Sequence, residues 1–283
     1  MSDRENLLSE LSDGSFPNAP LLREADGDVV SRFRGHRIRS VFQPVMSNYD
    51  GSTVGHFARV RSDRDGVAPV GGFHWAALAV TGPPDLVLQL DRMSRTLHAL
   101  NYFAGADPSW RLFLRVQSRL IETVGSGHGR VFERILATLG VPTRAIVIEL
   151  PRDLNEDPAL FSRALLSYRS LGYKVAADCL HDADAMLRGR YDVVPDVVVL
   201  DHRWVSGRTA LEDLVGQIHA VGAQALVTRI ENAETLRTAR EIGADLLQGY
   251  HLGRPERHAT PAADPGAGRA PRGFRHEALV AQH

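Results

Sequence analysis

The sequence has one cysteine, one lysine and no long hydrophobic run. The single cysteine, Cys179, excludes an intrachain disulfide. Lys174 is the single lysine, so arginine supplies the other basic side chains, and chemistry that needs a lysine has one candidate. No stretch of about 18 uncharged apolar residues occurs, which argues against a membrane-spanning helix. The N-terminal residues are charged and lack the apolar core of a signal peptide, so we expect a cytoplasmic protein.

Neither sign of charge dominates. Lys and Arg number 33, and Asp and Glu number 34, which gives a formal net charge of −1. This balance removes the usual electrostatic argument for binding nucleic acid or an anionic membrane, and we expect neither as a partner. With 43% hydrophobic residues among 283, the chain has enough apolar material for one large domain or two small ones.

The chain divides into three parts by composition. Residues 1–37 form an N-terminal extension, in which leucines at helical spacing over residues 2–12 predict a short helix followed by a loop. Residues 38–256 carry the periodic patterns of a folded domain. Residues 257–283 are rich in Pro, Gly and Ala and contain few large apolar residues, which predicts a flexible tail.

Short β-branched runs alternate with longer amphipathic stretches within the central part. Runs that are nearly all apolar are typical of strands covered on both faces, and hence of a parallel sheet. Eight strands alternating with helices over about 220 residues predict an α/β fold of the TIM-like (β/α)8 type. An open doubly wound sheet is the alternative, although no glycine-rich nucleotide-binding motif follows the first strand. The predicted strands span residues 41–45, 53–60, 111–117, 145–150, 173–178, 195–201, 223–228 and 245–248.

The later amphipathic stretches have Leu, Ile or Ala at helical intervals. Each is followed closely by a glycine, which commonly ends a helix because it adopts the left-handed conformation without a steric penalty. The pattern predicts helices that lead into buried strands. Three such stretches span residues 159–170, 210–221 and 233–242.

Polar residues close several otherwise apolar strands. The functional groups of a (β/α)8 barrel lie where its strands end at the C-terminal face, so these residues are site candidates. Acidic oxygens from neighbouring strand ends suit a hard cation such as Mg²⁺, which activates water or binds phosphate. A polar residue also occurs wherever a strand reaches the surface, so a structural role stays open for each. The residues in question are Glu149, Asp178, Asp201 and Gln248.

Nine short motifs in colinear order resemble those of the EAL domain family. That family consists of (β/α)8-barrel phosphodiesterases that linearise the bacterial second messenger cyclic di-GMP with two divalent metals. The resemblance covers about residues 41–256, and its strongest part is the QGY…RP ending. The motifs are FQPV (42–45), GHFARVR (55–61), LDRM (90–93), FLRVQ (113–117), IVIELP (146–151), LGYKVAADC (171–179), PDVVVLD (195–201), IENAETL (230–236) and GADLLQGYHLGRP (243–255).

The chain departs from the family pattern where the resemblance places metal binding and catalysis. The namesake Glu-Ala-Leu falls on residues 57–59, so the phenyl ring of Phe57 replaces a metal-binding glutamate. The other departures are Arg152 for a glutamate, Cys179 for one of two aspartates, Val199 for the catalytic lysine and Thr228 for a further glutamate.

Other family positions keep an oxygen ligand or an arginine. The asparagine ligand of the family falls on Gln117, whose amide oxygen lies one methylene further out. Arg61 matches an arginine that in the family meets a ligand phosphate, although a salt bridge at the barrel mouth fits it equally well. By family position, the candidate ligand-binding residues are Arg61, Gln117, Glu149, Asp178, Asp201 and Gln248.

The retained oxygens are too few for a two-metal cluster. Even second-shell losses cost about 10- to 100-fold in metal affinity, and here several direct ligands are missing. We therefore expect no cofactor, with Mg²⁺ or Mn²⁺ only if a weak site survives at Glu149 and Asp178; the alternative for this pair is bonding to backbone or arginines. Lys174 lies four residues before Asp178, toward the opposite end of the strand, so it cannot replace the catalytic lysine.

Three functions remain open. We favour a degenerate, catalytically inactive EAL-type domain that acts as a bacterial signalling module by binding an unidentified regulatory protein. The alternative is a receptor that binds cyclic di-GMP without cleaving it, through Arg61, Asp201 and Gln117. An active phosphodiesterase is the third, and the replaced residues argue against it. The sequence leaves homodimerisation open.

Overall fold

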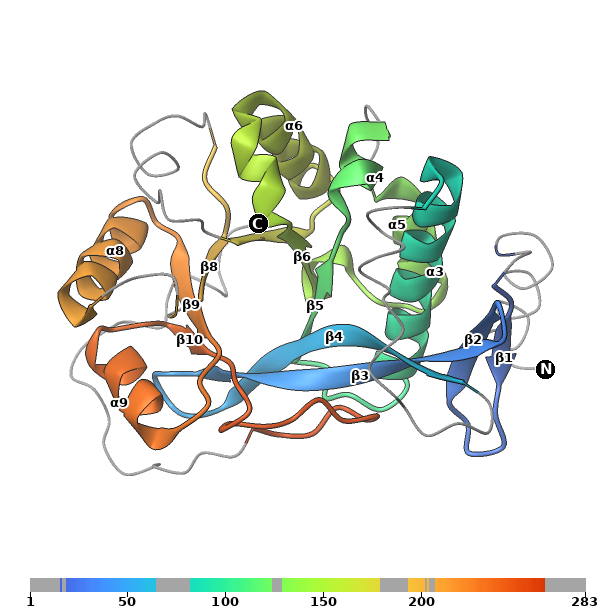
Figure 1. Cartoon of the computed structure of the whole chain (residues 1–283), viewed down its shortest axis with the longest axis horizontal. Coiled ribbons are helices and arrows are strands. Elements are labelled where there is room, and N and C mark those ends of the chain that lie inside the picture. The colour runs from blue at the N-terminus through green and yellow to red at the C-terminus, as the bar shows by residue number, and fades with distance from the viewer. Residues whose placement is uncertain are drawn as a thin grey trace.

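The computed structural model describes residues 16, 19–64, 82–123, 129–178, 193–201, 203 and 207–262. Eight strands, β3 to β10, close into a barrel with helices around it (Figure 1). This confirms the predicted barrel, and each predicted strand overlaps one of the eight. They are β3 (His36–Ser47), β4 (Thr53–Arg64), β5 (Arg111–Arg115), β6 (Ile146–Leu150), β7 (Lys174–Asp178), β8 (Val197–Asp201), β9 (Gln224–Thr228) and β10 (Leu246–Leu247).

One barrel strand runs against the others. β3 pairs antiparallel with both β4 and β10, whereas the remaining neighbours pair in parallel. Residues 48–52 join β3 to β4, and so short a connection permits only an antiparallel pair. The expectation of a wholly parallel sheet is therefore wrong for β3.

The barrel interior is a packed apolar core. Phe57 on β4 lies 4.8 Å from Phe113 on β5, measured between ring centroids, and both rings are almost completely buried. Val199, at the family's lysine position, belongs to the same cluster, so an apolar side chain stands where the family has an amine. The cluster comprises Val45, Phe57, Phe113, Val147, Ala176, Val197, Val199, Leu226 and Leu246.

Helices cover the outside of the barrel, and three of them confirm the predicted stretches. Asp157 and Asn232 cap two of these helices with their side chains, and a glycine with positive φ follows each of the three. None of the helices in the described ranges combines the length and the hydropathy needed to cross a bilayer. The helices are α3 (Pro84–Tyr102), α4 (Ser118–Thr123), α5 (Arg130–Thr138), α6 (Pro158–Arg169), α8 (Arg208–Ala220) and α9 (Ala233–Glu241), with 3-10 turns at Thr143–Ala145 and Arg152–Glu156.

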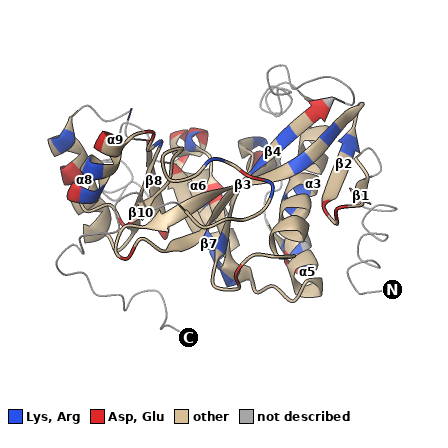
Figure 2. Cartoon of the chain, turned by 90° about the horizontal axis from the view of Figure 1, so that it is seen from below, with Lys and Arg blue, Asp and Glu red and all other residues tan. Residues whose placement is uncertain are grey.

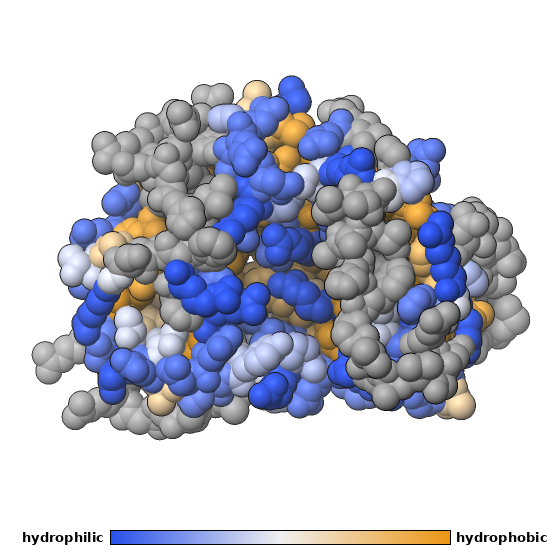
Figure 3. Space-filling model, viewed as in Figure 1, coloured by the Kyte–Doolittle hydropathy of each residue, from blue (hydrophilic) through white to orange (hydrophobic). Residues whose placement is uncertain are grey.

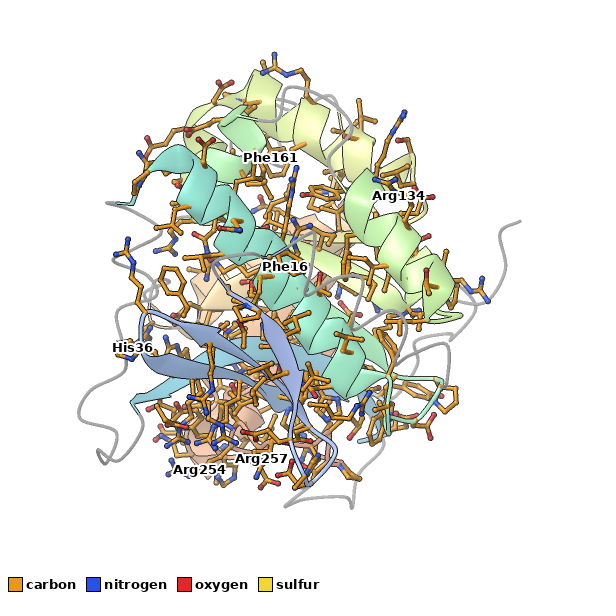
Figure 4. All side chains as sticks on the ribbon, turned by 90° about the vertical axis from the view of Figure 1, so that its right-hand side faces the viewer. Phe16, His36, Arg134, Phe161, Arg254 and Arg257 are labelled. Carbon is orange, nitrogen blue, oxygen red and sulfur yellow. The ribbon has the colours of Figure 1, made fainter. Side chains whose placement is uncertain are left out.

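A hairpin precedes the barrel where the sequence analysis expected a loop. Its strands, β1 (Leu21–Arg23) and β2 (Val29–Phe33), extend the sheet beyond β3. The Asn101 side chain on α3 bonds both the amide and the carbonyl of Val29, which holds the hairpin beside α3 (Figure 4). The predicted helix over residues 2–12 lies outside the described residues.

The chain after β10 returns along β3. The main-chain groups of Glu256 and Phe42 bond each other in both directions. Arg257 donates to Asp28 at 2.6 Å and so joins this segment to the hairpin. Residues 257–262, the start of the predicted flexible tail, are thus packed against the domain.

Candidate functional site at the barrel mouth

Charged side chains lie directly above the apolar interior, at the C-terminal ends of the strands. Glu149 on β6 is 3% exposed, and Arg115 on β5 is its partner in the strand register. Asp178 ends β7 and Asp201 ends β8. Because parallel strands end at the same side of a barrel, these residues meet around its mouth. Figure 3 shows hydrophilic residues gathered over the middle of the face that is seen in Figure 1.

Arg115 connects two carboxylates of the mouth, those of Glu149 and Asp178. Its Nη1 lies 3.6 Å from Glu149 Oε1, and its Nη2 lies 3.6 Å from Asp178 Oδ2. Both distances are ion pairs, but they exceed the range of good hydrogen bonds. Glu149 Oε2 is buried and has no hydrogen-bond partner in the described part of the chain. Arg115 therefore neutralises both carboxylates without saturating them.

Arg59 covers the residue that replaces the namesake glutamate. Its guanidinium carbon lies 4.9 Å from the centre of the Phe57 ring, a cation–π distance. Its Nη1 lies 3.6 Å from Glu149 Oε2. The Phe57 ring and the Arg59 guanidinium thus occupy adjacent layers of β4, one apolar and one cationic, beside the retained glutamate.

Arg152 makes a further ion pair at Asp178. Its Nη2 lies 3.8 Å from Asp178 Oδ1. Burial raises the pKa of Asp178 above its ordinary value, and the nearby charge of Glu149 raises it further, while Arg152 and Arg115 act in the opposite direction. The net effect shows that the arginines compensate only partly for the desolvation of this carboxylate.

Asp201 has its own arginine partners. Arg203 donates to it from Nε at 2.9 Å and from Nη2 at 2.6 Å, a bidentate pair. Arg229 Nε lies 3.9 Å from Asp201 Oδ2, and Arg229 has a φ of 65°, a left-handed conformation that is unusual for a residue other than glycine. Burial alone would raise the pKa of Asp201, but the bonds from Arg203 outweigh it and hold the pKa below its usual range.

Arg61 lies one step further along β4, on the same face as Arg59. Its register partner on β3 is Arg39, so two like charges stand directly opposite each other. Asp63 pairs closely with Arg39 at 2.7 Å, and lies 4.0 Å from Arg61 Nε. The Arg61 side chain is 51% exposed. Figure 2 shows bands of basic residues across β2, β3 and β4, with an acidic band at the end of β4.

The structure brings Glu149, Asp178 and Asp201 to one mouth. Gln117 lies two residues beyond the end of β5. The β5 residue that faces Glu149 is Arg115, not Gln117, because the strand ends earlier than predicted.

The final strand end keeps its glutamine. Gln248 is 8% exposed and follows β10. Gly249 comes next, where an added Cβ would lie 2.0 Å from the Ile230 carbonyl oxygen, so this passage of the QGY motif requires glycine. Thr228, at a family glutamate position, donates its hydroxyl to the Leu200 carbonyl at 3.2 Å. Cys179 lies outside the described residues.

The mouth does not fit a pair of divalent metals. Arginine guanidinium groups lie against Glu149 and Asp178, the oxygen donors that a cation would need. In the described part of the chain, no three His, Cys, Asp or Glu side chains are grouped closely enough to hold a metal ion. The carboxylates that could bind a metal ion are thus already neutralised by arginines of the same chain.

The arginines of the mouth were not predicted as site residues. Arg59 and Arg115 each lie two residues after an inward-facing phenylalanine, Phe57 and Phe113. Because side chains of a strand alternate between faces, this spacing places both arginines on the inner face, immediately above the core. The signal was present in the sequence, but alignment to the family's motifs drew attention to Gln117 instead.

Comparison with known proteins identifies the family. The sequence profile described as EAL domain matches residues 26–255, most of the chain. The chain belongs to the EAL domain family. No curated protein shows a significant match to the sequence. Solved structures of other EAL proteins share the fold at low sequence identity.

Three of these structures define the likeness. The Bacillus subtilis protein YkuI, in complex with cyclic di-GMP and calcium, superposes with a TM-score of 0.67 at 22% identity, over 80% of this chain and 56% of that chain. The FimX EAL domain gives 0.65 at 17%, over 91% and 97%. Klebsiella pneumoniae BlrP1, with calcium and cyclic di-GMP, gives 0.63 at 18%, over 77% and 56%. The present chain thus matches little more than half the length of YkuI and BlrP1.

Proposed function

We propose that this chain is an EAL domain that does not hydrolyse cyclic di-GMP and acts as a regulatory module by binding another protein. The observation that supports the first part is the ion-pair network in which Arg59 and Arg115 neutralise Glu149 and Asp178. Hydrolysis in the family uses two metals and a lysine, as the resemblance implies. A guanidinium stays protonated, so it cannot accept a proton from an attacking water.

Purified protein incubated with cyclic di-GMP and either Mg²⁺ or Mn²⁺ tests this part. We expect the cyclic dinucleotide to remain intact when the mixture is separated by chromatography. The Glu149→Ala variant provides the matched control, because the family would use this carboxylate as a metal ligand. Turnover by the wild type that disappears in Glu149→Ala contradicts the proposal.

The protein-binding part is supported by the fold, because a barrel keeps its surface when the chemistry of its mouth changes. Affinity purification of the tagged full chain from its own cells should recover one partner in near-stoichiometric amount. Recovery of no such partner, with and without added cyclic di-GMP, contradicts this part.

A second candidate function is a receptor for cyclic di-GMP that binds without cleavage. The observation in its favour is the cationic mouth and the exposed Arg61, whose Nε lies 4.0 Å from Asp63 Oδ1, beyond hydrogen-bond range. Calorimetric titration with cyclic di-GMP should show binding that Arg61→Ala weakens. Arg208→Ala, which removes an exposed arginine on α8, is the matched control. Absence of heat at high micromolar ligand removes this candidate.

A further inference from the structure

Among the described residues, the ion pairs of the mouth involve more guanidinium groups than carboxylates. In the described part of the chain, the ion pairs at the mouth join three carboxylates, those of Glu149, Asp178 and Asp201, to a larger set of arginines. A site with excess positive charge and partly desolvated walls attracts anions. The arginines of these pairs are Arg59, Arg115, Arg152, Arg203 and Arg229.

The ion pairs of Arg115 are long enough for another acceptor to replace the carboxylates as the partner of its N–H groups. A guanidinium bonded firmly to a carboxylate shows N···O distances near 2.8 Å, as between Arg203 and Asp201. Arg115 lies at 3.6 Å from both Glu149 and Asp178. Its side chain is 41% exposed, so another acceptor can approach the same N–H groups from solvent. Arg115 thus neutralises the two carboxylates, but its N–H groups remain able to form hydrogen bonds with another acceptor.

Arg59 completes one side of this site. Its side chain is 40% exposed, and it faces the same Glu149 from β4 while Arg115 faces it from β5. The two guanidinium groups therefore approach one buried carboxylate from neighbouring strands. A phosphate group accepts hydrogen bonds from two guanidinium groups readily, because its oxygens are charged and point in several directions.

We propose that Arg59 and Arg115 bind a phosphate group of an anionic ligand directly, without metal, and that Glu149 and Asp178 weaken this binding by competing for the same N–H groups. If the two carboxylates held metal ions, as the resemblance to the EAL family implies, they would promote the binding of an anionic ligand. Here their effect has the opposite sign. The inference deepens the receptor function proposed above, and it names the ligand class as a phosphate ester or free phosphate.

Calorimetric titrations of the full chain in EDTA, with cyclic di-GMP and separately with inorganic phosphate, test this inference. Asp178→Asn should tighten binding by about tenfold, because one competing charge is removed. Arg115→Gln should weaken it by at least a similar factor, and Asp213→Asn, which removes an exposed carboxylate on α8, should leave it unchanged. Binding of cyclic di-GMP alone identifies the diester as the ligand, and equal binding of both identifies the phosphate group.

Three results overturn the inference. They are weaker or unchanged binding in Asp178→Asn, binding that requires Mg²⁺, and no binding of either anion by the wild type. Thermal unfolding of each variant shows whether it is folded. If Asp178→Asn is not folded, Glu149→Gln provides a second test of whether the removal of a carboxylate charge tightens anion binding. Because EDTA excludes metal-dependent turnover, failure here is distinguishable from failure of the non-hydrolytic assignment.

Discussion

Carboxylates occupy both ends of the barrel, but they are held differently. At the N-terminal end, Asp196 accepts from Lys174 Nζ and from the Val175 amide, each at 2.9 Å. Asp245 accepts from the Ala225 amide at 2.7 Å and lies 2.8 Å from His219 Nε2. In both cases an aspartate just before one strand bonds the backbone of its neighbour. These bonds join adjacent strands and serve the fold.

Among the described residues, Glu149 and Asp178 at the mouth accept no such bonds from neighbouring strands. Glu149 and Asp178 face arginines at 3.6 to 3.8 Å, and one oxygen of Glu149 has no hydrogen-bond partner among the residues that the structure describes. The pKa of Asp178 is raised by burial. Burial would also raise the pKa of Asp196, but the bonds from Lys174 and the Val175 amide outweigh it and lower that pKa. The comparison separates carboxylates that stabilise the fold at one end from two carboxylates, Glu149 and Asp178, whose burial costs stability at the end where the ligand sites of this fold lie.

The largest expected effect concerns the apolar layer beneath the mouth. Phe57→Ala removes a ring packed against Phe113, and the cavity should reduce the free energy of unfolding by about 3–5 kcal/mol. Urea denaturation measures this. A loss below about 1 kcal/mol would show that the layer is not the support of the mouth.

The next effect separates the two ends directly. Asp196→Asn places an amide N–H against the donors of Lys174 and Val175, and should cost about 1–3 kcal/mol of stability at neutral pH. The cost should shrink as the pH falls below about 4. The pKa of Asp196 is lower in the folded protein than in the unfolded chain, so the charged carboxylate stabilises the fold at neutral pH, and this stabilisation is lost as the carboxylate becomes protonated. Urea titrations of both proteins across this pH range check the sign. A cost that stays constant down to pH 2 contradicts the assignment.

The smallest effect is expected at the mouth. Asp178→Asn is the same substitution at the other end, and it should change the free energy of unfolding by no more than about 1 kcal/mol. Burial raises the pKa of Asp178, which means that the charged side chain is disfavoured at this position. The variant with the neutral amide should therefore be at least as stable as the wild type at neutral pH, within this range. A loss equal to that of Asp196→Asn would remove the distinction between the two ends.

Much of the barrel could be predicted from the sequence because its strands are short apolar runs separated by helices with clear endings. The direction of β3 could not, since the pattern of a buried strand is the same in parallel and antiparallel sheets. The hairpin of β1 and β2 was missed because these strands are only three and five residues long. Asp26-Gly27 between them was the available signal.

The site was predicted in part. Glu149, Asp178 and Asp201 lie together as expected, because strand ends of a barrel converge. Arg59 and Arg115 were missed. Motifs in colinear order show which family residues are replaced, but they do not show which other side chains of this protein lie beside the replaced positions. The strand register supplied that information, and it places Arg115 opposite Glu149.

The most direct test of this account is a titration of the protein with Mn²⁺, followed by electron paramagnetic resonance. Free Mn²⁺ gives a sharp signal that is lost on binding. If Arg59 and Arg115 neutralise Glu149 and Asp178 as the structure indicates, protein in several-fold excess should leave the signal unchanged, with and without cyclic di-GMP. Loss of the signal in the wild type, restored by Glu149→Gln, would show that a cation displaces the arginines and would contradict the account.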